Sequence, residues 1–176
     1  MKTKKIIAMV MVAASLACSV AGCGSSDDVK VIDGQQKADA QSVAAGYVFS
    51  YQGTEIAVDA DFAPILETLG EPNTYFESES CAAQGIGKNY SYTDFEIETY
   101  PDGDVDRVLY VMLTSDAVST AEGINLSSSK EDVIAAYGEP TKEVSGSLIY
   151  EMGDMKLKFL FSGDSMVSIE YDSAKA

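Results

Sequence analysis

The chain contains one motif twice, and this internal repeat limits its fold more than any other feature. Residues 56–72, IAVDADFAPILETLGEP, align without gaps on residues 124–140, INLSSSKEDVIAAYGEP. In each copy, two alternating apolar residues precede a polar cluster, a short amphipathic stretch and the sequence Gly-Glu-Pro. Polar residues can cap the first turn of a helix, and a glycine followed two residues later by a proline ends one. The repeat therefore predicts two helices of about two turns, which are stable only when they pack on another element.

The polar clusters also predict where the two helices begin. Asp59 or Asp61 can accept hydrogen bonds from the free amides of the first helix, and a serine of 127–129 can do so in the second. Asp132 follows Ser129 by three residues, which is the spacing of a capping box.

After each helix the chain alternates between apolar and polar residues, which is the pattern of half-buried strands. Turn residues such as Gly, Asp and Ser separate these segments, so they predict hairpins. If the two central strands of the copies face each other, Glu96 and Glu98 pair with Lys156 and Lys158 across the join. The predicted strands are 90–92, 95–100 and 107–113 in the first copy, and 148–151, 155–161 and 167–171 in the second.

A further hairpin precedes the first copy. With Gln52-Gly53 as its two-residue turn, Phe49 lies opposite Ile56 and Tyr47 lies opposite Val58. The apolar residues then share one face, so the hydrophobic pattern and the turn agree on the register.

The two copies differ in length between helix and central strand. The segment between Pro72 and Phe95 is eight residues longer than its counterpart in the second copy, and it includes Phe76 and Cys81. Loops that vary in an otherwise repeated fold often carry function, and we therefore expect a binding loop at residues 73–91.

These patterns predict an α+β protein made of two tandem repeats, each a short helix packed on a three- to four-stranded antiparallel sheet. Repeat 1 is expected to span residues 47–122 and repeat 2 residues 123–176, together forming one globular domain. Whether the two repeats share one sheet or form two facing sheets stays open at this point.

The N-terminal residues have the three zones of a secretion signal. Three lysines precede an apolar run at residues 6–17, which is shorter than the roughly 20 residues that a spanning helix needs. The run is followed by Val20-Ala21-Gly22-Cys23, which resembles the bacterial lipobox. We expect residues 1–22 to be a lipoprotein signal peptide that is removed, and Cys23 to be lipid-modified.

The resemblance to a lipobox implies a cellular location for the protein. A diacylated Cys23 supplies two hydrocarbon chains, enough for stable membrane residence. Residues 23–46 are polar, small and without a sustained period, so we expect the lipidated cysteine to be followed by a flexible tether. The expected location is the extracytoplasmic face of the bacterial cell membrane, with membrane lipid as a partner through Cys23.

Composition excludes several classes of function. The chain has no histidine, which removes the commonest general base and the usual nitrogen ligand of zinc. Its net charge of −16 disfavours binding to nucleic acid, which requires clustered Lys and Arg. The acidic run Asp102-Gly103-Asp104-Val105-Asp106 lacks the later residues of an EF-hand and favours a hairpin turn, so we expect no metal and no cofactor.

Two further chemical candidates receive plainer interpretations. With Cys18 removed and Cys23 lipidated, Cys81 has no partner for a disulfide, and we expect it to be buried as a small hydrophobe rather than to be a reactive thiol. The pairs Glu77/Glu79 and Glu96/Glu98 could in principle perform acid–base work on a sugar. Their alternate spacing in extended segments favours a solvated face instead.

The sequence as a whole resembles two groups of proteins. A helix with Lys-Glu-Asp-Val-Ile-Ala-Ala-Tyr-Gly-Glu-Pro, followed by a meander and present twice, resembles β-lactamase inhibitor protein-like tandem-repeat domains and, more distantly, small outer-membrane assembly lipoproteins. Residues 80–103 also resemble uncharacterised lipoproteins of Gram-positive bacteria. In the inhibitor of the first group, aromatic residues on the sheets contact another protein. For this chain the resemblance implies the fold and not inhibitor activity, and the analogous aromatic residues would be Tyr92, Tyr100, Tyr150 and Phe159.

We therefore expect a non-catalytic binding module for a protein, peptide or glycan. One alternative is a structural or assembly partner in the cell envelope, and another is an enzyme that uses carboxylates or Cys81. The surplus of Tyr over Phe, 10 against 6, favours recognition by amphipathic rings. The candidate ligand-binding residues are Phe76, Cys81, Tyr92, Tyr100 and Tyr150.

Overall fold

The structure, a computed structural model, describes residues 46–176, which fall within one compact unit. The predicted signal peptide, Cys23 and nearly all of the predicted tether lie outside the described residues. The α+β class is confirmed. The elements in chain order are β1 (Phe49–Tyr51), β2 (Thr54–Ile56), α1 (Phe62–Leu69), β3 (Thr74–Glu79), β4 (Ile86–Ser91), β5 (Phe95–Asp102), β6 (Val105–Leu113), α2 (Lys130–Tyr137), β7 (Lys142–Val144), β8 (Ser147–Met152), β9 (Met155–Ser162) and β10 (Ser165–Ser173).

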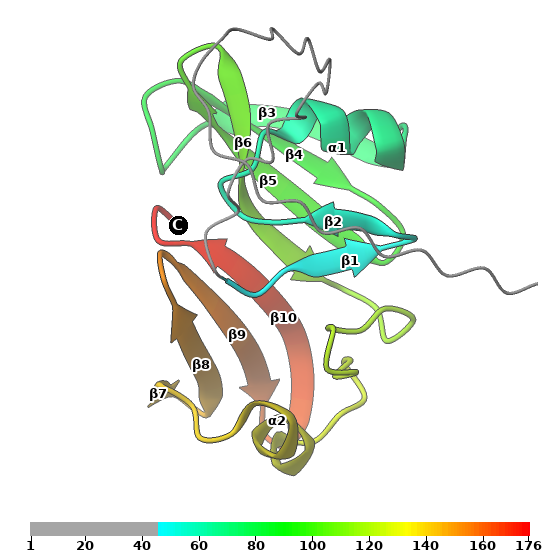
Figure 1. The fold of residues 1–176 in the computed structure, drawn as a ribbon, viewed down its shortest axis with the longest axis vertical. Helices are drawn as coiled ribbons and strands as arrows, with labels where there is room; N and C mark the ends of the chain where they lie inside the picture. Colours follow the sequence, from blue (N-terminus) through cyan, green and yellow to red (C-terminus); the bar gives the residue numbers. More distant parts are fainter. Residues whose placement is uncertain (1–45) are drawn as a thin grey trace, which may run out of the picture. The chain divides into compact units, whose positions relative to one another are not determined.

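Eight of the strands form one antiparallel sheet in the order β3-β4-β5-β6-β10-β9-β8-β7 (Figure 1). The two halves of the chain meet in its middle, where residues 110–113 of β6 pair with residues 169–172 of β10. One continuous sheet is therefore formed, and β1 and β2 make a separate two-stranded sheet.

The two halves have the same order of elements, a helix followed by four strands. The bounds of β9 and β10 equal those of β5 and β6 shifted by 60 residues, and the bounds of α2 equal those of α1 shifted by 68. Gly103 and Gly163 occupy equivalent turns and have the same φ of 65°, a backbone conformation that favours glycine. The difference of eight residues lies between the helix and the central strand, as the sequence indicated.

The predicted helix ends are confirmed. The Asp61 side chain accepts a hydrogen bond from the Ala63 amide and caps α1. Ser129 and Asp132 form the full capping box of α2, and the bonds to Ser129 lower the pKa of the Asp132 carboxyl. Gly70 and Gly138 follow the two helices with φ of 76° and 78°, where a side chain would be strained.

A tyrosine in each half fastens the end of the helix to the sheet. The Tyr92 hydroxyl donates to the Gly70 carbonyl at 3.1 Å, and the Tyr150 hydroxyl donates to the Gly138 carbonyl at 2.9 Å. Both bonds satisfy a carbonyl beyond the last helical turn, where intrahelical partners are missing.

Replacing either tyrosine with phenylalanine is expected to lower the free energy of unfolding by about 1 kcal/mol, because one hydrogen bond to a helix end is lost. Urea denaturation of Tyr92→Phe and Tyr150→Phe measures the loss. Tyr51→Phe is the matched control, since the Tyr51 ring packs on Phe95 and its hydroxyl makes no hydrogen bond within residues 46–176. Equal stability of all three variants and the parent would contradict this role.

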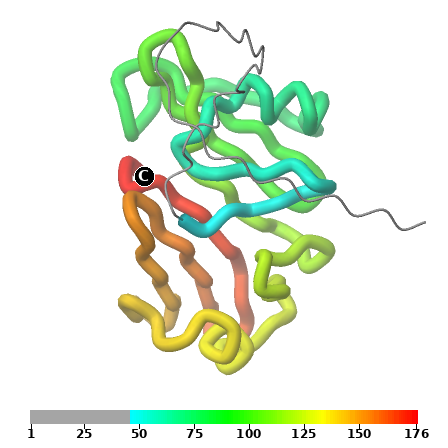
Figure 2. Tube along the Cα trace, in the orientation of Figure 1, coloured from blue at the N-terminus to red at the C-terminus, as the bar shows by residue number. Residues whose placement is uncertain are grey.

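One face of the large sheet, here the covered face, carries the core. Figure 2 shows the β1–β2 hairpin in cyan in front of the junction between the halves. Phe49 of this hairpin contacts Phe95 of the first half and Tyr171 of the second, with ring centroids 5.3 and 6.0 Å apart. The predicted register of Phe49 opposite Ile56 is confirmed. The helices cover the flanks through contacts of Phe62 with Tyr90, and of Tyr137 with Tyr150 and Phe159.

Two expectations about the strands are wrong. Residues 73–91 are not a loop, because most of them form the β3–β4 hairpin with an unbroken register. Glu96 and Glu98 do not pair with Lys156 and Lys158, because β6 and β10, rather than β5 and β9, meet at the join. Lys158 instead lies beside Glu170 and Asp172 of β10.

Candidate functional site

The face of the large sheet opposite the helices, here the open face, has no helix or strand of residues 46–176 packed on it. Its side chains form two rows that cross the sheet from strand to strand in register. The first row is Ser91, Glu96, Met112, Glu170, Lys158 and Ile149, and the second is Asn89, Glu98, Tyr110, Asp172, Lys156 and Glu151.

Tyr110 and Met112 lie at the centre of the open face, on the strand where the two halves join. Tyr110 has Glu98 on one side and Asp172 on the other, and Met112 has Glu96 and Glu170. Burial and the negative charge of Glu98 raise the pKa of the Tyr110 hydroxyl. The Tyr110 hydroxyl accepts a hydrogen bond from the Asn89 amide at 3.4 Å and lies within an acidic surround.

The polar side chains of the open face hold one another in place. Ser91 bonds to Glu96 at 3.1 Å, and Ser168 bonds to Glu170 at 3.0 Å. Asn89 and Asp172 are only 6% and 4% exposed although no helix or strand of residues 46–176 covers them, and Tyr110 and Lys158 lie against them. The open face is therefore ordered and net acidic, with Lys156 and Lys158 on its β9 side.

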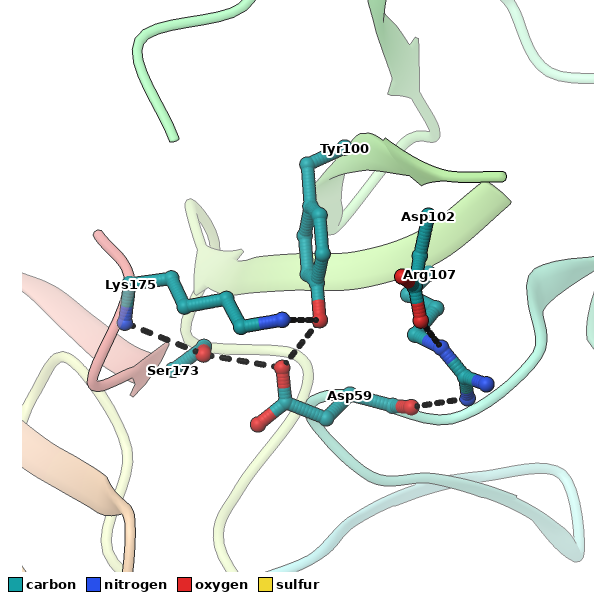
Figure 3. Close-up of polar contacts among 6 residues, drawn as sticks. All are labelled: Asp59, Tyr100, Asp102, Arg107, Ser173 and Lys175. Carbon is teal, nitrogen blue, oxygen red and sulfur yellow. Dashed lines mark hydrogen bonds and ion pairs between the residues drawn. The ribbon is translucent and has the colours of Figure 1, made fainter. Parts of the chain in front are cut away.

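A second polar group, here the Asp59 cluster, joins the loop before α1 to β5, β6 and the C-terminal end of β10 (Figure 3). The Asp59 carboxylate accepts hydrogen bonds from the hydroxyls of Tyr100, at 2.7 Å, and Ser173, at 2.9 Å. Its carbonyl accepts from the Arg107 guanidinium at 2.9 Å, and its amide donates to the Val108 carbonyl at 2.8 Å. These bonds hold Asp59 at a φ of 61°, which is uncommon for a residue with a side chain.

Two cations complete the Asp59 cluster. Lys175 donates to the Tyr100 hydroxyl at 2.8 Å and lies over the Tyr100 ring, and Arg107 pairs with Asp102 at 2.6 Å. Together with Asp154 and Ala174, the members of the cluster line a pocket of about 310 Å³.

The Asp59 cluster contains serine, tyrosine and lysine, and the pKa values of its Tyr100 and Lys175 are both raised. Burial is the main cause that raises the pKa of Tyr100, and the bond to Tyr100 raises that of Lys175. A tyrosine or lysine that accepts a proton near neutral pH needs a lowered pKa instead. The bonds of the cluster tie the C-terminal residues to the loop before α1, which is a structural role.

The β3–β4 hairpin carries the predicted site residues Phe76 and Cys81. All six residues of β3 are exposed, and Phe76 is 52% exposed at the edge of the open face, opposite Asn89. Cys81 lies at the hairpin tip, in a pocket of about 450 Å³ lined by residues 79–86 alone. The expectation that Cys81 is buried is wrong, since it is exposed.

The thiol of Cys81 is expected to react with a maleimide in the folded protein at nearly the rate measured in urea. Labelling of residues 24–176, in which Cys81 is the one thiol, measures this by mass spectrometry. Cys81→Ser should change the free energy of unfolding by less than about 0.5 kcal/mol, as for other surface positions. A native thiol that labels more than a hundred times more slowly would contradict the exposed position.

The other predicted site residues lie apart from Phe76 and Cys81, on the covered side of the sheet or in the Asp59 cluster. Tyr100 and Tyr150 are 1% and 3% exposed, so neither belongs to an exposed surface. Tyr150 lies on the covered face opposite Leu157, and Tyr100 lies in the Asp59 cluster. Tyr92 is half-buried against Phe95 on the same covered side. Alternation along a strand separates two faces, but it does not tell which face is covered.

The turn at Asp102–Val105 is a hairpin turn, as predicted. Among residues 46–176, no group of three acidic or Cys side chains is arranged to hold a metal ion. Within that same part of the chain, no helix is both long and apolar enough to cross a bilayer.

Comparison of the chain with protein-family models, with curated proteins and with solved structures finds no match.

Proposed function

We propose that the protein is a lipid-anchored lipoprotein of the extracytoplasmic membrane face that acts as a non-catalytic binding module. Its ligand is a protein, peptide or glycan, and the open face is its binding surface. The lipobox-like Val20-Ala21-Gly22-Cys23 supports the anchor. The open face, with Tyr110 and Met112 at its centre, is the observation that carries the binding function.

The composition of the open face supports recognition rather than simple solvation. Tyr and Met are enriched at the centres of protein interfaces, where charged residues usually form the rim. The open face has this arrangement, with Tyr110 and Met112 inside and carboxylates beside them. Its side chains are already ordered by mutual hydrogen bonds, so binding costs less side-chain entropy than on a mobile surface.

The repeated order of elements supports the proposed architecture. The bounds of β9 and β10 equal those of β5 and β6 shifted by 60 residues, as expected for two copies of one helix-plus-meander unit. We infer that the halves are tandem repeats, similar in design to β-lactamase inhibitor protein-like domains. That resemblance concerns the fold, and one fold hosts many functions.

Reversing charge on the open face tests the proposal. Glu96→Lys/Glu98→Lys is expected to remove the stable complex that the wild-type protein forms in detergent-solubilised membranes, as measured by chemical cross-linking and gel mobility. Glu67→Lys/Glu139→Lys is the matched control, because it changes net charge equally at two exposed positions near the helices. Loss of the complex in both variants, or in neither, would count against an open-face binding site.

A further inference from the structure

Strand β3 is an edge of the large sheet, and no strand of residues 46–176 pairs with its outer side. Proteins usually blunt such edges with short strands, prolines, lysines or bulges, because unpaired backbone groups there attract another strand. The opposite edge, β7, has three residues and begins with a lysine, whereas β3 has six residues, TYFESE, in unbroken register with β4. All six residues are exposed.

The backbone groups available at this edge follow from the pairing with β4. In an antiparallel pair, every second residue directs its amide and carbonyl toward the neighbouring strand. Ser80 donates to the Gly85 carbonyl at 2.9 Å, so Tyr75, Glu77 and Glu79 direct their backbone groups away from β4.

The side chains of β3 define what an added strand must offer. Tyr75, Glu77 and Glu79 lie on one side of the strand, and Tyr75 donates to the Glu77 carboxylate. Lys88, directly opposite Glu77 on β4, pairs with Asp106 at 2.6 Å instead. No ion pair joins Glu77 or Glu79 to a cation within residues 46–176. On the other side, Phe76 leaves an exposed apolar surface.

We propose that β3 adds an extended peptide segment as a ninth strand, and that this segment alternates basic residues, facing Glu77 and Glu79, with apolar residues beside Phe76. Main-chain hydrogen bonds supply the affinity in such strand addition, and the alternating side chains supply the specificity. Opposite charges on directly paired residues stabilise the added strand. The net charge of −16 attracts a basic segment and disfavours a second copy of this chain as the occupant. This site uses the backbone edge of β3 and borders the open face through Phe76.

The experiment uses the mature lipidated protein in neutral detergent micelles and a capped, fluorescent peptide, Val-Lys-Val-Lys-Val-Lys-Val. Binding is measured by anisotropy, and amide exchange by NMR. The peptide is expected to bind and to slow exchange at Tyr75, Glu77 and Glu79. Methylating its backbone nitrogens on the edge that faces β3 is expected to abolish binding, whereas methylation on the outer edge is not.

Two variants make the proposal falsifiable. Glu77→Pro removes an outward amide without touching the β3–β4 bonds, and is expected to weaken binding about tenfold or more. Glu77→Lys/Glu79→Lys is expected to lose affinity for the lysine-containing peptide and to bind Val-Glu-Val-Glu-Val-Glu-Val instead. Unchanged affinity in both variants, or slowed exchange outside β3, would overturn the proposal. A dimer of the free protein that Glu77→Pro abolishes would overturn it in favour of self-pairing. In the Glu96→Lys/Glu98→Lys variant, whose open face is altered, the peptide should still slow exchange of the β3 amides. Failure of the open-face proposal can therefore be distinguished from failure of the β3 proposal.

Discussion

Replacing Asp59 with alanine is expected to lower the free energy of unfolding by about 3 kcal/mol, as measured by urea denaturation. The change removes the acceptor for the hydroxyls of Tyr100 and Ser173, which are 1% and 0% exposed. A buried donor left without a partner costs about 1–3 kcal/mol. Alanine at a φ of 61° adds roughly 1 kcal/mol of backbone strain.

Two substitutions separate these causes. Asp59→Asn retains an oxygen acceptor and tolerates the left-handed backbone, so its expected cost is about 1 kcal/mol or less. Asp59→Gly removes the acceptor but relieves the backbone strain. Its loss in free energy of unfolding should therefore lie between the losses for alanine and asparagine. Equal losses for alanine and asparagine would show that the hydrogen bonds of the Asp59 cluster do not hold the C-terminal residues in place.

Replacing Cys23 with alanine is expected to abolish incorporation of radiolabelled fatty acid into the protein. The proposed anchor attaches both hydrocarbon chains at this residue, and stable anchoring requires two chains. Labelling of growing cells followed by immunoprecipitation gives the measurement, and salt-washed membranes of the wild type should retain the protein.

Cys81→Ala is the matched control for the anchor. It removes a cysteine that is exposed at the hairpin tip, and it should leave labelling unchanged. Label that persists in Cys23→Ala, or that disappears in Cys81→Ala, would contradict anchoring at Cys23.

Local signals in the sequence were sufficient to predict the helices and most strands. The Asp61 cap, the Ser129–Asp132 capping box and the Gln52-Gly53 turn each depend on residues within a few positions of one another. Periods of 3.6 and 2 then fix the element type between these signals. Strands β3 and β7 escaped prediction because edge strands are exposed on both sides and lack alternation.

Long-range pairing could not be predicted in the same way. That β6 meets β10 depends on packing between residues about 60 positions apart, and no local pattern encodes it. The pairing of β6 with β10 determines which side of every strand is covered. As a result, Tyr150 is buried and Tyr110 is not. Tyr110 and Met112 were therefore missed as site residues, although alternation with Leu109, Val111 and Leu113 had already placed them on one face together.

The Asp59 cluster was missed for a related reason. Asp59 and Ser173 are 114 residues apart, and neither lies in a recognisable motif beyond a helix start and a strand end. The exposed position of Cys81 likewise depends on its place in the turn between β3 and β4, which the sequence pattern did not predict to be a hairpin. A cysteine is more often buried than exposed, so the residue type alone favoured a buried position for Cys81.

Site-specific photocross-linking in intact cells tests most directly whether the open face is a binding surface. A photoreactive phenylalanine analogue is placed at Tyr110, at Met112 or, as a control on the exposed side of α1, at Glu67. The same adduct is expected from positions 110 and 112 and none from position 67. Absence of an adduct from both open-face positions, or an equal adduct from position 67, would contradict the proposed binding module.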